Sequence, residues 1–153
     1  LFTEGTVEAF STDKYQYWPN AERYGFSMIR DFNRGTVGWT DWNLLLDQTG
    51  GPNHVSNFCF APIHGDTSTG ELIYTPTYYY IGHFSKFVGP DSVRISTSVS
   101  RNVVLATSFL NPDGTMATIV MNKSNDSINY SFFLNDRQVD LTIPPRAMQT
   151  LVY

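Results

Sequence analysis

The hydrophobic pattern of this chain changes at Asp91, and that change constrains its fold more than any other feature. Before it, two short apolar runs alternate with two segments in which apolar residues recur at helical spacing. After it, apolar residues recur at every second position, the period of a half-buried strand. The sequence therefore predicts an α/β region over residues 1–90 followed by an all-β region over residues 91–153.

The first region has the order strand, helix, strand. Leu1–Gly5 is a short apolar run that ends in a carboxylate and a glycine. A helix of about fifteen residues is expected next, with Asn20 as its N-cap and Gly35 at its end. Thr36–Leu46 is the second strand-like run. This order predicts two parallel strands joined by a right-handed crossover, and two strands cannot close a barrel.

A long connection and a second helix complete the first region. Asp47–Thr75 is expected to be a loop, and loops of this length are usually functional or contain small elements of their own. Thr75 is the expected cap of the second helix, with Pro76 at its first position, and Gly89-Pro90 ends it.

Six short strands with turn signals between them follow Asp91. Asn111–Gly114 and Asn135-Asp136 are the clearest turns. Such a pattern is typical of a β-sandwich or part of one. The expected strands cover 93–99, 103–109, 116–121, 128–134, 139–143 and 147–153.

Composition excludes several classes of protein. The net charge is −4 and the basic residues are scattered, which argues against a nucleic-acid partner. Cys59 is the single cysteine and the histidines number three, so we expect neither a disulfide nor a structural metal, and no cofactor. No apolar run reaches the length of a membrane span. Leu1 lies in mid-strand, so we expect a piece of a longer polypeptide in which any signal peptide is not visible.

Two stretches are candidates for chemistry. Trp39 and Trp42 bracket Thr40 and Asp41, so in an extended chain Trp39 and Asp41 share one face while Thr40 and Trp42 share the other. One face can be packed while the other lines a site, although both indoles could simply fill a core. Glu4 stands at the carboxyl end of its strand, where α/β barrels carry their chemistry, or it is a solvated acid at a strand end.

Three motifs taken together resemble the glucosylceramidase-type glycoside hydrolases of family 30. They are GWTDWN at 38–43, GGPN at 50–53 and GHFSKF at 82–87, and they follow the run that ends in Glu4. The resemblance covers the chain almost end to end. It implies the last strands and helices of a (β/α)₈ barrel within residues 1–90, a side β-sandwich over 91–153, and hydrolysis of β-glycosides with retention.

The resemblance also implies roles for individual residues. Glu4 matches the nucleophile at the end of the seventh barrel strand, and the acid/base glutamate lies on the fourth strand, upstream of Leu1. Trp42 matches the floor of the sugar-binding −1 subsite, and Asn57 and Phe58 match residues of the same pocket. The isolated chain is therefore expected to be inactive, with the remainder of the barrel as its partner.

Several alternatives stay open. Trp39 is included among the candidate substrate-binding residues, although Trp39 and Asp41 are both expected to be mainly structural. Cys59 is interpreted as a buried thiol and His83 as a helix-to-sheet hydrogen-bonding residue. The substrate could be glucosylceramide, β-1,6-glucan or another β-glucoside, and His54 departs from the family pattern, which leaves leaving-group preference undecided. The competing function is a non-catalytic carbohydrate-binding module. Secretion, periplasmic export or lysosomal targeting would suit the enzyme.

Overall fold

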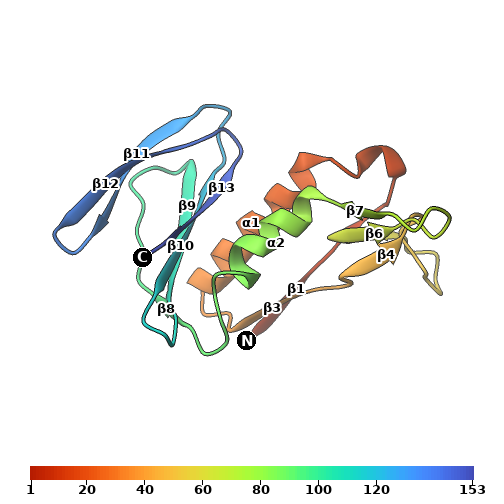
Figure 1. Cartoon of the computed structure of the whole chain (residues 1–153), viewed down its shortest axis with the longest axis horizontal. Coiled ribbons are helices and arrows are strands. Elements are labelled where there is room, and N and C mark those ends of the chain that lie inside the picture. Colours follow the sequence, from red (N-terminus) through yellow and green to blue (C-terminus); the bar gives the residue numbers. More distant parts are fainter. The chain divides into compact units, whose positions relative to one another are not determined.

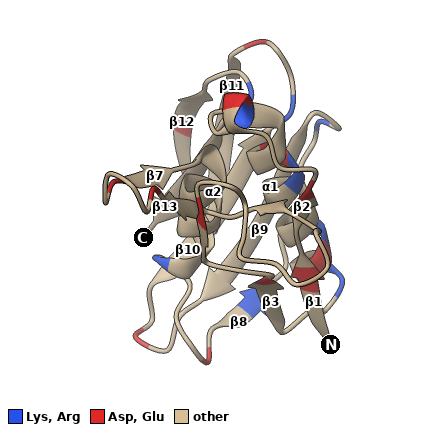
Figure 2. Ribbon diagram, turned by 90° about the vertical axis from the view of Figure 1, so that its right-hand side faces the viewer, with Lys and Arg blue, Asp and Glu red and all other residues tan.

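The structure, a computed structural model, describes residues 1–153 and divides into two compact units, Leu1–Gly82 and His83–Tyr153 (Figure 1). The division falls within the second α-helix, and each unit is described by itself. None of the helices is both long and apolar enough to span a bilayer. Basic and acidic residues are interspersed along the ribbons of both units (Figure 2).

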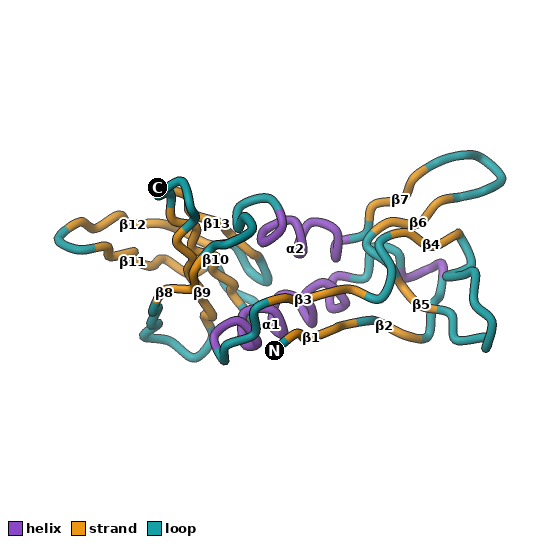
Figure 3. The backbone as a smooth tube through the Cα atoms, turned by 90° about the horizontal axis from the view of Figure 1, so that it is seen from below, coloured by secondary structure: helices purple, strands orange, loops and turns teal.

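The first unit is built on a parallel pair of strands. Strand β1 (Phe2–Gly5) pairs with β3 (Gly38–Asp41) in the register Glu4↔Thr40, and helix α1 (Trp18–Asn33) connects them. Figure 3 shows the two strands side by side with α1 next to them. The predicted strand, helix, strand order and its parallel pairing are confirmed.

Helix α1 begins earlier than the sequence predicted. Tyr17 occupies the N-cap position and Pro19 lies in the first turn, so the predicted cap at Asn20 is wrong. The fixed φ of proline suits the first helical turn, which lets the helix start before the asparagine. At the other end Gly35 has a φ of +95°, as a C-terminal glycine should. The buried face contains Ala21, Tyr24, Gly25, Met28 and Ile29.

The second apolar run is two strands rather than one. It is divided into β3 and β4 (Leu45–Asp47), because the chain leaves β1 after Asp41 and β4 instead pairs in parallel with β6 (Ile63–Gly65). Strand β7 (Leu72–Tyr74) completes that sheet in the order β4-β6-β7. The expected small elements of the long connection are therefore present.

Two more strands and a 3₁₀ turn belong to the first unit, and a second helix runs across the boundary between the units. Strand β2 (Val7–Glu8) pairs antiparallel with β5 (Cys59–Phe60), and a 3₁₀ turn covers Thr12–Lys14. Helix α2 (Pro76–Ser85) begins at the predicted residue but ends before the predicted Gly89. Thr75, the predicted cap, directly precedes this helix; its carbonyl accepts from the amide of Tyr78, and its hydroxyl donates to the carbonyls of Ala61 and Pro62.

The second unit is the predicted six-stranded β structure. Strands β8 (Val93–Ile95), β9 (Val104–Leu110), β10 (Met116–Asn122) and β13 (Met148–Val152) form an antiparallel sheet in the order β13-β10-β9-β8. Strands β11 (Ile128–Leu134) and β12 (Arg137–Ile143) form a separate hairpin. Its inward residues Ile128 and Ile143 pack against Val104, Ala106 and Val120.

Asn122 is the polar centre of this second unit. The side chain is completely buried; its amide donates to the carbonyls of Asp126 (2.7 Å) and Pro144 (2.9 Å), and its oxygen accepts from the amide and hydroxyl of Ser124 (both 2.8 Å). One asparagine thus holds the end of β10 to two turns. Although Asn122 opens a glycosylation triplet in the sequence, its nitrogen is fully used in the folded chain.

Asn122→Ala should therefore lower the free energy of unfolding by about 3 kcal/mol, because several buried backbone and hydroxyl groups lose their partner at once. Urea denaturation followed by circular dichroism measures the change. Asn125→Ala, an exposed site in the same turn, is the control and should cost less than about 1 kcal/mol. Equal losses in the two variants would contradict this account of Asn122.

Candidate active site

The site is organised by two parallel strands that end side by side. Glu4 is the penultimate residue of β1, and its register partner Thr40 is the penultimate residue of β3. Beyond the strands, the backbone amide of Trp42 donates to the carbonyl of Gly5 at 3.2 Å. The residue that follows the predicted nucleophile is therefore joined to the predicted floor of the sugar site by one backbone hydrogen bond.

An aromatic ring lies over a glycine on each face of this strand pair. A Cβ on Gly5 would come within 2.5 Å of the indole of Trp39, and a Cβ on Gly38 would come within 2.1 Å of the ring of Phe2. Each glycine leaves the space that the opposing ring needs. The pair therefore has two distinct faces, one bearing Trp39 and the other bearing Phe2.

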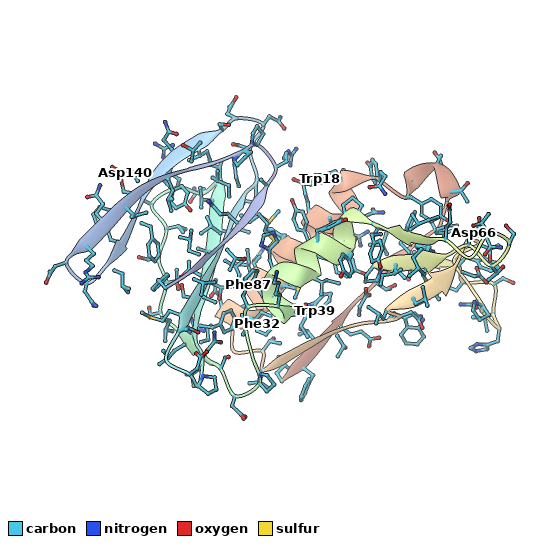
Figure 4. All side chains as sticks on the ribbon, viewed as in Figure 1. Trp18, Phe32, Trp39, Asp66, Phe87 and Asp140 are labelled. Carbon is cyan, nitrogen blue, oxygen red and sulfur yellow. The ribbon has the colours of Figure 1, made fainter.

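Trp39 lies on the helix-facing side of the pair. Its ring packs edge-on against that of Tyr24 on α1, with 5.3 Å between the ring centroids. The Trp39 side chain is labelled in Figure 4. Because strand residues alternate, Glu4 faces the other way, and it is exposed. The structure therefore does not bring Trp39 together with Glu4, and its position fits the structural role that the sequence favoured for it.

Asp41 shares the helix-facing side with Trp39. Its Oδ1 accepts hydrogen bonds from the hydroxyl of Tyr24 and from the backbone amide of Trp42, each at 2.8 Å. Burial raises the pKa of Asp41 to about 6; the nearby charge of Glu4 adds to this rise, and the two hydrogen bonds oppose it. These contacts fit the structural role expected for Asp41, whereas its partner on α1 was not foreseen from the sequence.

The loop that carries Asn57 and Phe58 is folded around Asn53. The Oδ1 of Asn53 accepts from the amides of Val55 (2.8 Å) and Asn57 (3.1 Å), and its Nδ2 donates to the carbonyl of Asn57 at 2.6 Å. Gly51 precedes a cis proline and lies close to the ring of Phe58. The asparagine of the GGPN motif thus acts as a brace for the predicted binding residues.

The same loop is joined to the segment that follows Glu4. Strand β2 pairs with β5 in the register Glu8↔Cys59, and the amide of Phe10 donates to the carbonyl of Phe58 at 3.2 Å. Phe58 is 40 % exposed and Trp42 is 59 % exposed, which leaves both rings accessible. The segment that runs from Glu4 to Phe10 is therefore hydrogen-bonded to the loop that carries Asn57 and Phe58.

His64 holds the two ends of this loop together through hydrogen bonds of its side chain. Its ring is fully buried, its Nε2 accepts from the amide of Ala61 at 3.0 Å, and its Nδ1 donates to the carbonyl of Asp47 at 2.9 Å. Phe10 and Tyr15 pack against the imidazole. An acceptor at Nε2 requires the neutral ring, and burial lowers the pKa of His64 accordingly.

Two further expectations from the sequence concern single residues. Cys59 is buried, as predicted for an unreactive thiol, and its Sγ donates to the carbonyl of Asn57 at 3.4 Å. His83 lies on α2 with its Nδ1 2.8 Å from the hydroxyl of Thr150 on β13, the predicted helix-to-sheet hydrogen bond. The sequence missed Asn53, His64 and Tyr24, whose isolated polar atoms acquire meaning only once their partners are known.

Parallel strands ending in a glutamate, with an accessible indole beside it, are typical of a glycoside hydrolase barrel. The family model of the glycosyl hydrolase family 30 TIM-barrel domain matches residues 1–88, and that of the family's β-sandwich domain matches residues 91–151. The chain belongs to glycosyl hydrolase family 30. The predicted fold class, part of a TIM barrel followed by a β-sandwich, is confirmed.

Curated relatives and solved structures agree with this assignment. "Putative glucosylceramidase 3" of Caenorhabditis elegans is 37% identical over 139 residues, which are 89% of this chain and 27% of the relative. "Lysosomal acid glucosylceramidase" of Mus musculus is 38% identical over 112 residues, 72% of this chain and 22% of the relative. The chain thus spans about a quarter of these relatives.

Two solved structures have the same fold. SrfJ from Salmonella typhimurium superposes with a TM-score of 0.94 at 35% identity, over 99% of this chain and 34% of that one. The endo-β1,6-glucanase BT3312 superposes with a TM-score of 0.80 at 26% identity, over 98% of this chain and 34% of that one.

His64→Phe should lower the free energy of unfolding by about 3 kcal/mol. The phenyl ring can still pack against Phe10 and Tyr15, but the buried amide of Ala61 and carbonyl of Asp47 lose their partners. Thermal and urea denaturation measure the loss. His54→Phe, at an exposed position in the neighbouring loop, is the matched control and should change stability by less than about 0.5 kcal/mol. A loss no larger than that of the control would contradict the bracing role of His64.

Asp41→Asn should change how stability depends on pH. The folded state binds the proton of Asp41 more tightly than the unfolded state, in which the pKa is near 3.8, so the stabilisation is fully present below pH 3.8 and lost as the pH rises through about 6. Relative to the parent chain, the variant should therefore gain about 1–2 kcal/mol between pH 4 and 7, a value reduced for partial exposure of the group. Denaturation at each pH measures the difference. Asp66→Asn is the control; a constant difference across this pH range for Asp41→Asn would contradict the prediction.

Proposed function

We propose that this chain is the nucleophile-bearing part of a retaining β-glycosidase. The observation that carries the proposal is the position of Glu4, exposed at the carboxyl end of a parallel barrel strand and joined through Gly5 to the accessible indole of Trp42. Active sites of TIM barrels lie at that end of the strands. Family membership supports glycoside hydrolysis as the reaction class.

In the proposed reaction the carboxylate of Glu4 attacks the anomeric carbon of the β-glycoside while a second carboxylic acid protonates the departing oxygen. The covalent glycosyl-enzyme is then hydrolysed by water with the second group acting as base. Retaining enzymes hold the two carboxyl groups about 5 Å apart. We place the second group on barrel strands supplied by further polypeptide, since these residues contribute a two-stranded parallel pair. The 153-residue chain by itself should then be inactive.

Trp42, Asn57 and Phe58 form the proposed sugar site around Glu4. An indole face covers the C–H face of a pyranose and removes apolar surface from water. The exposed amide of Asn57 offers a donor and an acceptor to sugar hydroxyls, and Asn53 holds the backbone at that point. Trp39 is left out of the proposed sugar site because it packs against Tyr24.

The proposed substrate class is a β-glucoside. Relatives bear the names of glucosylceramidases, and a structural neighbour is an endo-β1,6-glucanase, so glucosylceramide and β-1,6-glucan are the two substrates to compare. A secreted, periplasmic or lysosomal location suits either one.

The test uses the complete enzyme that carries these residues, incubated with a 2-deoxy-2-fluoro β-glucoside. The fluorine slows release of the covalent intermediate, so intact mass should rise by one sugar and peptide mapping should place that sugar on Glu4. Glu4→Gln should take no label and lose at least about 10⁴-fold in kcat, because the nucleophile is absent. Glu8→Gln, an exposed glutamate on the next strand, is the matched control and should label normally.

Two results would overturn the proposal. Label on any residue other than Glu4 would assign the nucleophile elsewhere. If the parent enzyme takes no label and Glu4→Gln binds β-glucosides with unchanged affinity, the chain is a carbohydrate-binding module, which needs no isolated acid at a strand end.

A further inference from the structure

The backbone amide of Trp42 is shared between two acceptors. It donates to the carbonyl of Gly5 at 3.2 Å and to the Oδ1 of Asp41 at 2.8 Å. Gly5 directly follows Glu4, so this single N–H lies between the strand that carries the proposed nucleophile and the residue that forms the proposed sugar floor. Any movement of the amide changes the position of Trp42 relative to Glu4.

The second hydrogen-bond donor to the Oδ1 of Asp41 comes from helix α1. The hydroxyl of Tyr24 donates to the Oδ1 of Asp41 at 2.8 Å. Tyr24 is 4 % exposed and belongs to the buried cluster with Val7 and Phe60, and its ring packs against Trp39. A ring fixed on several sides can place its hydroxyl reproducibly, so Tyr24 gives the carboxylate a fixed anchor on α1.

The other oxygen of the carboxyl group takes no part in this arrangement. The Oδ2 of Asp41 is buried and has no hydrogen-bond partner. Burying a carboxyl group with one oxygen unpaired opposes folding. Its two short hydrogen bonds therefore serve local geometry at a cost in stability, which is a common property of functional sites.

We propose that Tyr24 and Asp41 are positioning residues that fix Trp42 relative to Glu4 in the sugar-binding site. This inference rests on the proposed function. Asp41 holds the first residue beyond the strand in place, and Tyr24 holds Asp41. In this proposal neither side chain contacts the reacting atoms. Both act by fixing the position of the Trp42 indole relative to the bound sugar.

The test compares Asp41→Asn, Asp41→Ala and Tyr24→Phe in the complete enzyme. Asparagine keeps an acceptor oxygen, so Asp41→Asn should stay within about threefold of the parent in kcat. Asp41→Ala removes both hydrogen bonds and should lower kcat and the rate of labelling by the fluoroglucoside by about 10–100-fold. Tyr24→Phe removes one hydroxyl and should lower them by about 5–10-fold.

Matched controls separate this role from general loss of stability. Tyr15→Phe removes a hydroxyl that donates to the carbonyl of Gln48 at 3.0 Å, and Asp66→Ala removes an exposed carboxylate that caps a distant turn. Both should leave kcat unchanged. Rates are measured well below each variant's unfolding temperature and normalised to folded protein, so a stability change alone does not alter them.

A double variant tests whether Tyr24 acts through Asp41. If Tyr24 acts only through Asp41, the variant carrying both Tyr24→Phe and Asp41→Ala should be no slower than Asp41→Ala alone. Should Asp41→Ala fail to fold, Tyr24→Phe decides the question. Unchanged kcat and labelling rate in folded Tyr24→Phe would overturn the inference. That result would leave Glu4 as the labelled residue, so the two proposals fail separately.

Discussion

The parallel pairing of β1 with β3 is the constraint on which the rest of the first unit depends. It makes the carboxyl ends of the two strands coincide, and it leaves two faces that cannot be exchanged. Gly5 accepts the ring of Trp39 on one face, while Gly38 accepts the ring of Phe2 on the other. A shift of one residue in register would clash both rings with side chains and would turn Glu4 toward the helix.

Helix α1 packs against one of these two faces, the one that bears Trp39 and Asp41. Rings from β3 and α1 pack together, and within that apolar layer a single hydrogen-bonded carboxylate, Asp41, reaches the end of the strand. In the long connection, Asn53 and His64 provide hydrogen bonds that a short irregular loop cannot supply from its own backbone. The exposed residues of the candidate site are thus held in place by the side chains of less exposed residues behind them.

The sequence predicted the elements with a strong period, whereas the roles given to the residues of the family motifs stay predictions. The six strands after Asp91 alternate clearly, and the second helix begins at Pro76 as expected. The cap of α1 and the division of the second apolar run were missed, because each depends on a competing local preference, the fixed φ of Pro19 and the end of pairing at Asp41. The Tyr24–Asp41 pair joins residues seventeen positions apart, and no local pattern marks such a contact.

Two titratable groups in the first unit, Asp41 and His64, contribute to stability with opposite dependence on pH. The raised pKa of Asp41 makes its contribution to stability largest in acid, whereas the lowered pKa of His64 makes its contribution decline once the pH falls below about 6.5. As the pH falls below about 6.5 the contribution of His64 declines, whereas that of Asp41 grows as the pH falls through about 6, so the two changes have opposite signs.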